Sequence, residues 1–104
     1  LLSTFNGQDV SNTAWAYARL DILHEQLMEA LAEQIMQPGF LATFDAQGIA
    51  NTAWAYAQLG IRNEALMSAF TDRIVDAEFL SMCNAQDVAH IAWAYIHLEV
   101  PATA

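Results

Sequence analysis

Residues 47–57 read QGIANTAWAYA, and they repeat residues 8–18, QDVSNTAWAYA, after an interval of 39 positions. The same interval separates the three tryptophans of the chain, Trp15, Trp54 and Trp93. Over whole units, residues 1–39 and 40–78 are identical at 18 of 39 positions. A period of 20–50 residues is typical of stacked supersecondary units in which neighbours bury one another's apolar faces. The sequence therefore predicts an array of similar units.

Each unit is predicted to contain two helices. Asn6 and Asp45 are suited to begin the first helix, because their side-chain oxygens can accept hydrogen bonds from its free backbone N–H groups. A second helix is expected from Glu25 and again from Glu64, since apolar residues recur there at every fourth position. An alternation typical of a strand appears only around the tryptophans, where the alternate residue is alanine, a helix former. We therefore expect no strands.

The predicted fold is all-α, an α-solenoid of stacked helix-turn-helix repeats with a 39-residue period. Its units are residues 1–39, residues 40–78, and a half repeat at residues 79–104 that contains the first helix alone. Terminal repeats normally carry polar caps, and neither end of this chain resembles one. We therefore expect the 104 residues to be an excerpt of a longer array.

The core is predicted to lie between two layers of helices. We expect it to contain the three tryptophans together with Leu27, Leu31, Leu66 and Phe70. Because the half repeat lacks a second helix, one side of its first helix should have no cover within the chain. This open apolar end is expected to be covered by further repeats or by a partner protein. It is predicted to comprise Trp93, Tyr95 and Leu98.

The first helix of each unit leaves one narrow stripe without large apolar side chains, which we call the slot. Alanine lies at its centre, with polar residues on either side. Small centres admit a ligand close to the backbone, and the polar side chains supply directional hydrogen bonds. One interpretation is thus a surface that reads an extended ligand, and the alternative is a solvated stripe that nothing constrains. The slot residues are Asn12, Ala16 and Arg19, then Asn51, Ala55 and Gln58, then His90, Ala94 and His97.

The repeated segments 8–18 and 47–57 resemble octotricopeptide and heptatricopeptide repeats, the helical repeats of RAP-associated organelle proteins. The resemblance implies an α-solenoid whose slot binds single-stranded RNA. It also implies a factor in RNA processing or translation, located inside the cell in a chloroplast or mitochondrion. Similar Asn-Thr-Ala repeats occur in bacterial effectors that bind host proteins, so the resemblance indicates fold more directly than function.

The charge of the chain favours a different ligand. Twelve acidic residues oppose three arginines and no lysine, which gives a formal net charge of −9. RNA affinity depends largely on neutralisation of phosphates by Lys and Arg, and a field of this sign repels a polyanion. A protein partner, in particular a basic one, is therefore the alternative to RNA, and the chain would then be an interaction scaffold or an accessory subunit of a larger assembly.

No arrangement of residues indicates catalysis. The sequence has no glycine-rich phosphate loop and no paired cysteines, since Cys83 is its single cysteine. His90 and His97 share a face of a helix, but two helical turns (about 10 Å) separate them, too far for one metal ion. We expect neither a cofactor nor a metal site, and no stretch of the sequence is long and apolar enough to span a membrane.

Overall fold

The computed structural model describes residues 5–98, and the regular structure of these residues is helical throughout. This confirms the all-α prediction. The elements in chain order are α1 (Gly7–Arg19), α2 (Glu25–Ile35), the 3-10 turn η2 (Leu41–Thr43), α3 (Ala46–Gln58), α4 (Glu64–Ile74), α5 (Ala77–Met82) and α6 (Ala85–Leu98). The first residues of α1, α3 and α6 are 39 positions apart, as are those of α2 and α4.

Local hydrogen bonds explain where the longer helices begin. The Asn6 side chain accepts a hydrogen bond from the backbone N–H of Asp9, whose carboxylate in turn accepts one from the Asn6 backbone. The same reciprocal pair joins Asn84 and Asp87 before α6. The Asp45 side chain accepts a hydrogen bond from the backbone N–H of Gly48, the third residue of α3. Each bond satisfies an N–H group that the helix itself leaves free.

In the first two units, a residue in the left-handed region of backbone conformation follows the first helix. Asp21 and Gly60 occupy equivalent positions and have φ angles of 55° and 72°. The next backbone N–H then donates back to a tyrosine carbonyl, from Ile22 to Tyr17 at 2.9 Å and likewise one unit later. Glycine adopts this conformation without steric cost, and Asp is among the few other residues that tolerate it.

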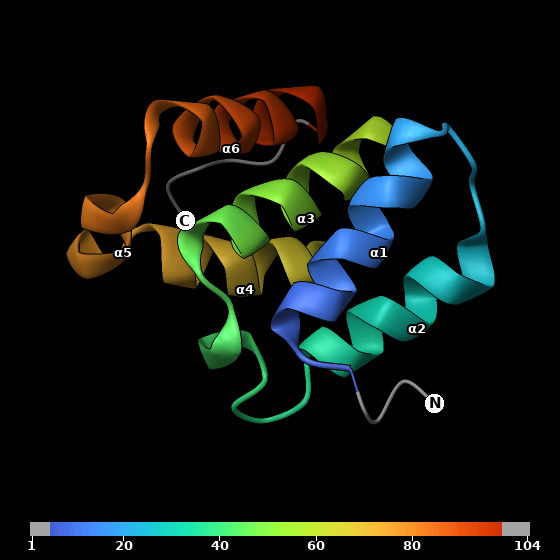
Figure 1. Ribbon diagram of the computed structural model, residues 1–104, viewed down its shortest axis with the longest axis horizontal. Helices are drawn as coiled ribbons and strands as arrows, with labels where there is room; N and C mark the ends of the chain where they lie inside the picture. The colour runs from blue at the N-terminus through green and yellow to red at the C-terminus, as the bar shows by residue number, and fades with distance from the viewer. Residues whose placement is uncertain (1–4, 99–104) are drawn as a thin grey trace.

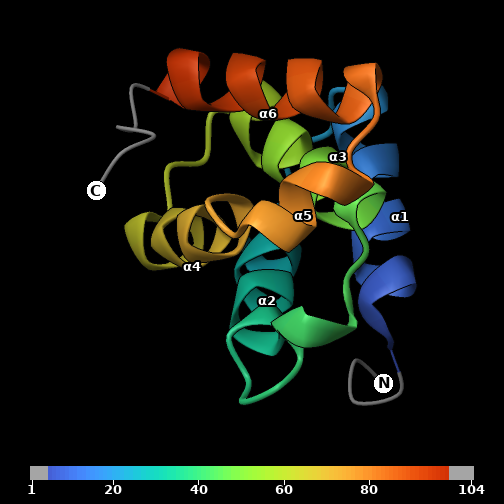
Figure 2. The ribbon, with the colours of Figure 1, turned by 90° about the vertical axis from the view of Figure 1, so that its left-hand side faces the viewer.

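The helices form two layers. Figure 1 shows α1, α3 and α6 side by side, and we call these three helices the A layer. Figure 2 shows α2 and α4 on one side of them, and we call these two the B layer, with α5 at the turn between α4 and α6. The A helices approach closely because alanines of α3 occupy the contacts. The buried alanines are Ala50, Ala53, Ala55 and Ala57.

Large side chains fill the space between the layers. Two equivalent tyrosines link the layers directly, because the Tyr56 hydroxyl donates to the Met28 carbonyl and the Tyr95 hydroxyl donates to the Met67 carbonyl. Tyr95 also shares a hydrogen bond of 2.7 Å with the Thr71 hydroxyl. The other large buried side chains are Met28, Leu31, Ile35, Leu66, Met67, Phe70 and Phe79.

Trp15 and Trp93 lie outside this core, so the prediction is wrong for these two tryptophans, whereas Trp54 packs against the core. Trp15 and Trp93 are each 38% exposed, and Trp54 is half-buried. Leu31, Leu66 and Phe70 are buried as expected, while Leu27 is half-buried. The reason is geometric. Each tryptophan precedes a tyrosine by two residues, about 200° around a helix, so both cannot face the B layer, and the tyrosine does.

The open end also differs from the prediction. Of the three residues expected to lack cover, Tyr95 and Leu98 are buried. Tyr95 faces α4 and not the end of the array, since its hydroxyl donates to the Met67 carbonyl. Only Trp93 is exposed. The exposed apolar side chains at this end lie elsewhere on α6 and on α5, a helix that the sequence did not predict. They are Leu80, Met82, Val88 and Ile96.

The buried tyrosines predict loss of stability in alkali. Burial raises the pKa of Tyr56 and Tyr95 above the ordinary value of 10.0. Above about pH 10 the unfolded chain therefore releases protons that the folded chain retains, and the free energy of unfolding falls until the folded pKa values are reached. The chain has no lysine that titrates in this range.

Urea unfolding at a series of pH values between about 8 and 11 measures this fall in stability. We expect the midpoint to fall steeply at the alkaline end, and Tyr56→Phe to flatten that fall while lowering stability at pH 8 by about 1 kcal/mol through the lost hydrogen bond. A wild-type midpoint that is constant up to pH 11 contradicts the prediction.

Candidate functional site

The A layer carries the slot residues, but only part of the slot is open. Asn12, Ala16 and Arg19 of α1 are all exposed. Ala55 of α3 and Ala94 of α6 are fully buried, so the expectation of an open alanine centre is wrong in the second and third units. The reason is that each of these helices turns this alanine toward the preceding A helix, and α1 has no preceding helix in the described part of the chain. The remaining slot residues are exposed at Gln58 and His97 and half-buried at Asn51 and His90.

Aromatic rings lie beside the polar slot residues. The Trp54 ring centroid is 5.8 Å from that of His90 and 6.2 Å from that of Trp93. Trp93 in turn stacks on His97, with ring centroids 4.5 Å apart and planes only 11° apart. In the first unit, the Arg19 guanidinium carbon lies 5.2 Å from the centroid of the Trp15 ring, within the range of a cation–π contact.

We call these six side chains the indole strip: Trp15, Arg19, Trp54, His90, Trp93 and His97. Residues from α3 and α6 meet in it directly. Trp54 is the most covered indole because His90 lies against it, whereas the residue equivalent to His90 in α3 is the smaller Asn51. The Nδ1 nitrogen of His90 is buried and has no hydrogen-bond partner among the described residues.

A polar groove lies at the N-terminal ends of α1 and α3. It has a volume of about 390 Å³. Asn12 and Asn51 both line it, so the structure does bring these two slot residues together. The neighbouring polar groups in the groove include Gln8, Ser11 and Gln47, and the carboxylate of Asp45 also lines it. Amide groups of this kind can both donate and accept hydrogen bonds.

Within the helices themselves, charged residues are divided unequally between the layers, and Asp21 and Asp45 flank the A helices α1 and α3. Within the A layer, α1 contains Asp9 and Arg19, α3 contains no charged residue and α6 contains Asp87, so the three helices sum to −1. Asp9 and Asp87 lie in the first turns, where they accept hydrogen bonds from backbone N–H groups. In contrast, α2 carries −3, α4 carries −1 and α5 carries −1, a sum of −5.

This distribution of charge bears on whether the net charge of −9 would repel RNA from every surface. Solvent-exposed charges farther apart than about 8–10 Å are largely screened at physiological ionic strength, so the local charge of a surface matters more than the net charge of the chain. The indole strip contains a guanidinium and two imidazoles and no carboxylate. The strip therefore combines exposed ring faces with side chains that include no carboxylate.

The sequence reasoning identified Arg19, His90 and His97 but missed the tryptophans beside them. The missed signal is the Trp-Ala-Tyr spacing, since two large rings 200° apart on a helix cannot both face one neighbouring layer. The described residues contain no group of three or more His, Cys, Asp or Glu side chains placed to hold a metal ion. None of their helices is long and apolar enough to cross a membrane.

Comparison with known proteins identifies a family for this chain. Residues 1–103 match the family model of the RNA-editing substrate-binding complex 6 protein, which is nearly the whole of the chain. No curated protein and no solved structure gives a significant match.

Proposed function

We propose that this chain, which belongs to the family of the RNA-editing substrate-binding complex 6 protein, is a non-catalytic component of an RNA-editing complex that contacts single-stranded RNA. The indole strip would make the contact. The observation that carries the proposal is the presence of exposed aromatic rings, with Trp93 adjoining Trp54 and His97, in a strip that contains no carboxylate.

The chemistry of the strip suits unpaired bases. Every base offers a π face, and stacking on an aromatic side chain contributes about 1–3 kcal/mol per base. Trp15 and Trp93 expose rings for this purpose, and Arg19 adds a positive charge beside the first. The amide groups of Asn12 and Asn51 can then bond the edges of splayed bases. A duplex hides these faces and edges, so the strip should discriminate against double-stranded RNA.

The repeat organisation belongs to the same proposal. We infer that residues 1–39, 40–78 and 79–104 are successive units of an α-solenoid similar to octotricopeptide arrays. Support comes from the 39-residue interval between the starts of α1, α3 and α6. The two tyrosine-to-carbonyl links between the layers follow the same interval. We place the protein in the mitochondrion, the one of the two organelles implied by the resemblance that accords with an RNA-editing complex.

A protein scaffold is the second candidate, and the B layer favours it. A groove of about 630 Å³ lies at α2 and α4, and its lining includes Glu25, Glu29 and Glu64 together with Arg62, which lies 3.7 Å from Glu64. Acidic side chains around a concave surface attract a basic partner and speed its association at low salt. The two functions use different layers, so one chain can serve both.

Binding of labelled RNA across a salt series tests the proposal. We expect a single strand to bind at least roughly tenfold more tightly than a duplex of equal length, because stacking needs free base faces. The salt dependence should be shallow, since the slope is about −0.7 per neutralised phosphate and the strip offers one permanent cation, Arg19.

Two results would contradict RNA contact through the strip. Equal affinity for single strand and duplex would place the contact on phosphates and not on bases. Absence of RNA binding at low salt, together with binding of a polylysine probe, would favour the scaffold. The indole strip would then contribute only to the packing of the A layer.

A further inference from the structure

One position of the A helices changes its charge from unit to unit. It is occupied by Arg19 in α1, Gln58 in α3 and His97 in α6, at intervals of 39 residues. Each of these residues follows the tryptophan of its helix by four positions, and residues spaced at i and i+4 share one face of a helix. A guanidinium is always positive and a carboxamide is neutral, whereas an imidazole gains its charge as the pH falls.

Two of the three side chains lie against their tryptophan. The Arg19 guanidinium carbon is 5.2 Å from the centroid of the Trp15 ring. The His97 ring stacks on Trp93, with centroids 4.5 Å apart and planes 11° apart. A cation over the face of an indole is attracted by the electron density of the ring. When it is protonated, His97 therefore gives the third unit the same pair of groups that Arg19 and Trp15 form in the first.

The exposure of His97 does not result from its place near the end of the described chain. Arg19 and Gln58 are both exposed, although a further A helix packs beside each of their helices. The two earlier units thus show that this position stays open to solvent when another unit follows. A ligand that runs along the A layer can reach it in every unit.

Among the described residues, the helix packed along α6 brings no charge to His97. This helix is α3, which contains neither an acid nor a base. The first charged residues after α3 are Arg62 and Glu64, and they pair with each other at 3.7 Å. No carboxylate of α3 therefore stands ready to neutralise a protonated imidazole on this side of α6.

The other titratable side chains near His97 in the sequence are Asp87, His90 and Glu99. Asp87 is buried at the first turn of α6, where its carboxylate accepts a backbone hydrogen bond. His90 is half-buried against Trp54, so it is less open to a ligand than His97. Glu99 lies outside the described residues.

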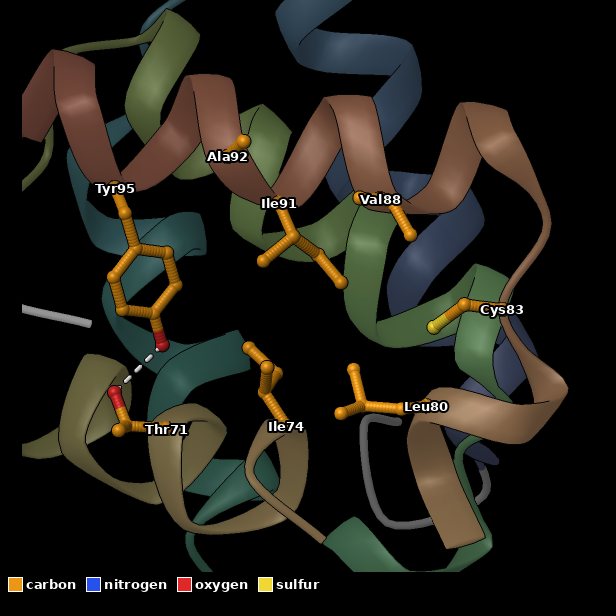
Figure 3. A pocket seen from close by; sticks show the side chains of 8 residues that line it. All are labelled: Thr71, Ile74, Leu80, Cys83, Val88, Ile91, Ala92 and Tyr95. Carbon is orange, nitrogen blue, oxygen red and sulfur yellow. Dashed lines mark hydrogen bonds between the residues drawn. The ribbon is translucent and has the colours of Figure 1, made fainter. Parts of the chain in front are cut away.

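The acids of α4 and α5 lie across the opposite face of α6. Figure 3 shows Tyr95 pointing from α6 toward α4, where its hydroxyl shares a hydrogen bond with Thr71. His97 follows Tyr95 by two residues, which is about 200° around a helix. The body of α6 therefore separates His97 from Asp72 and Glu78.

We infer that His97 is a titratable phosphate contact of the indole strip, through which the strip binds single-stranded RNA more tightly as the pH falls from about 8 to about 5.5. This inference rests on the proposed RNA contact. A strand whose base stacks on Trp93 would bring a backbone phosphate to protonated His97, as it would to Arg19 beside Trp15. Neutral His97 offers no such charge, so binding is coupled to the uptake of a proton.

Anisotropy of a labelled oligouridylate at pH 8 and pH 5.5 measures the effect. Uracil has no group that titrates in this range, and the strand carries no terminal phosphate, which would titrate. The affinity of the wild-type chain should rise at least roughly threefold at about 50 mM salt, and the salt dependence should steepen by up to about 0.7, the slope for one phosphate of a single strand. Circular dichroism establishes that the chain is folded at both pH values.

The repeats themselves supply the matched variants. His97→Gln copies Gln58 of the second unit and should lose most of the rise in affinity. His97→Arg copies Arg19 of the first unit and should bind at pH 8 as tightly as the wild type does at pH 5.5. The control outside the strip is His24→Asn, which should keep the full rise. It copies Asn63, whose side chain begins α4 with the same hydrogen bond that His24 makes before α2.

The outcomes separate this inference from the function on which it rests. RNA binding of equal strength at the two pH values would overturn the inference and leave the RNA contact in place. A full rise in His97→Gln would also overturn it, because the titrating group would then lie elsewhere. Absence of binding by both the wild type and His97→Arg at either pH would remove the RNA contact, and the inference with it.

Discussion

Tyr56→Ala is expected to lower the free energy of unfolding by roughly 3–5 kcal/mol, the range for truncation of a large buried aromatic residue. The ring is 1% exposed, and its hydroxyl donates to the Met28 carbonyl of α2, so one side chain links the layers. The substitution would leave a cavity and would remove the hydroxyl hydrogen bond to the Met28 carbonyl. Since a domain typically has about 5–15 kcal/mol of stability, a large share of the total would be lost.

The equivalent residue of the first unit is the matched control. Tyr17 is only half-buried, and its ring meets His24 edge-on with centroids 6.3 Å apart. No second helix of an earlier unit is described beneath it. Tyr17→Ala should therefore cost less than half as much in urea unfolding experiments. Equal losses for the two variants would show that the layers are not joined through Tyr56.

Much of the helical structure could be predicted because it is encoded locally. Asn6 and Asp45 accept hydrogen bonds from residues three positions later, so their effect is legible in the sequence. The starts of α2 and α4 at Glu25 and Glu64 agree with the predicted positions for the same reason. Periodic apolar residues such as Leu31 and Phe70 indicate a buried face without reference to any neighbour.

The orientation of the A helices could not be predicted so simply. Which side of α3 faces another helix depends on how closely the helices approach, and that distance is set by alanines such as Ala53 and Ala55. Large apolar residues were expected inside by default, but alanines occupy the buried face of α3, and only Trp54 among the indoles is covered by a neighbouring A helix. Trp15 and Trp93 are therefore displaced to the surface, while the slot centres at Ala55 and Ala94 are buried.

Composition gave the net charge but not its arrangement. The value of −9 is an average over surfaces that differ strongly, since α3 is uncharged and α2 carries three glutamates. Only the assignment of helices to layers shows that the glutamates of α2 and the acids of α4 and α5 lie outside the indole strip, while Asp21 follows α1 close to Arg19. The short helix α5 was missed for a related reason, because its six residues are too few to display a helical period.

The second large effect concerns RNA. The double variant Trp15→Ala/Trp93→Ala is expected to lower the affinity for single-stranded RNA by roughly 30-fold or more, since each stacked base contributes about 1–3 kcal/mol. Because each indole is 38% exposed and therefore still more than half buried, the double variant is also expected to lose stability, so RNA binding is compared at a temperature at which circular dichroism shows both proteins to be folded. The control is Met36→Ala/Val75→Ala, which removes two exposed apolar side chains that follow α2 and α4, outside the strip. An equal loss of affinity in the control would refute a specific role for the indoles.

Intrinsic tryptophan fluorescence tests the central claim most directly, because all three tryptophans of the chain lie in the indole strip. Unlabelled protein is titrated with a single-stranded RNA at low salt, and binding is followed in parallel by anisotropy of the labelled strand. Bases stacked on the strip should quench the emission saturably, with the same midpoint as the anisotropy. RNA binding that leaves the tryptophan emission unchanged, or no binding at all, would contradict the account.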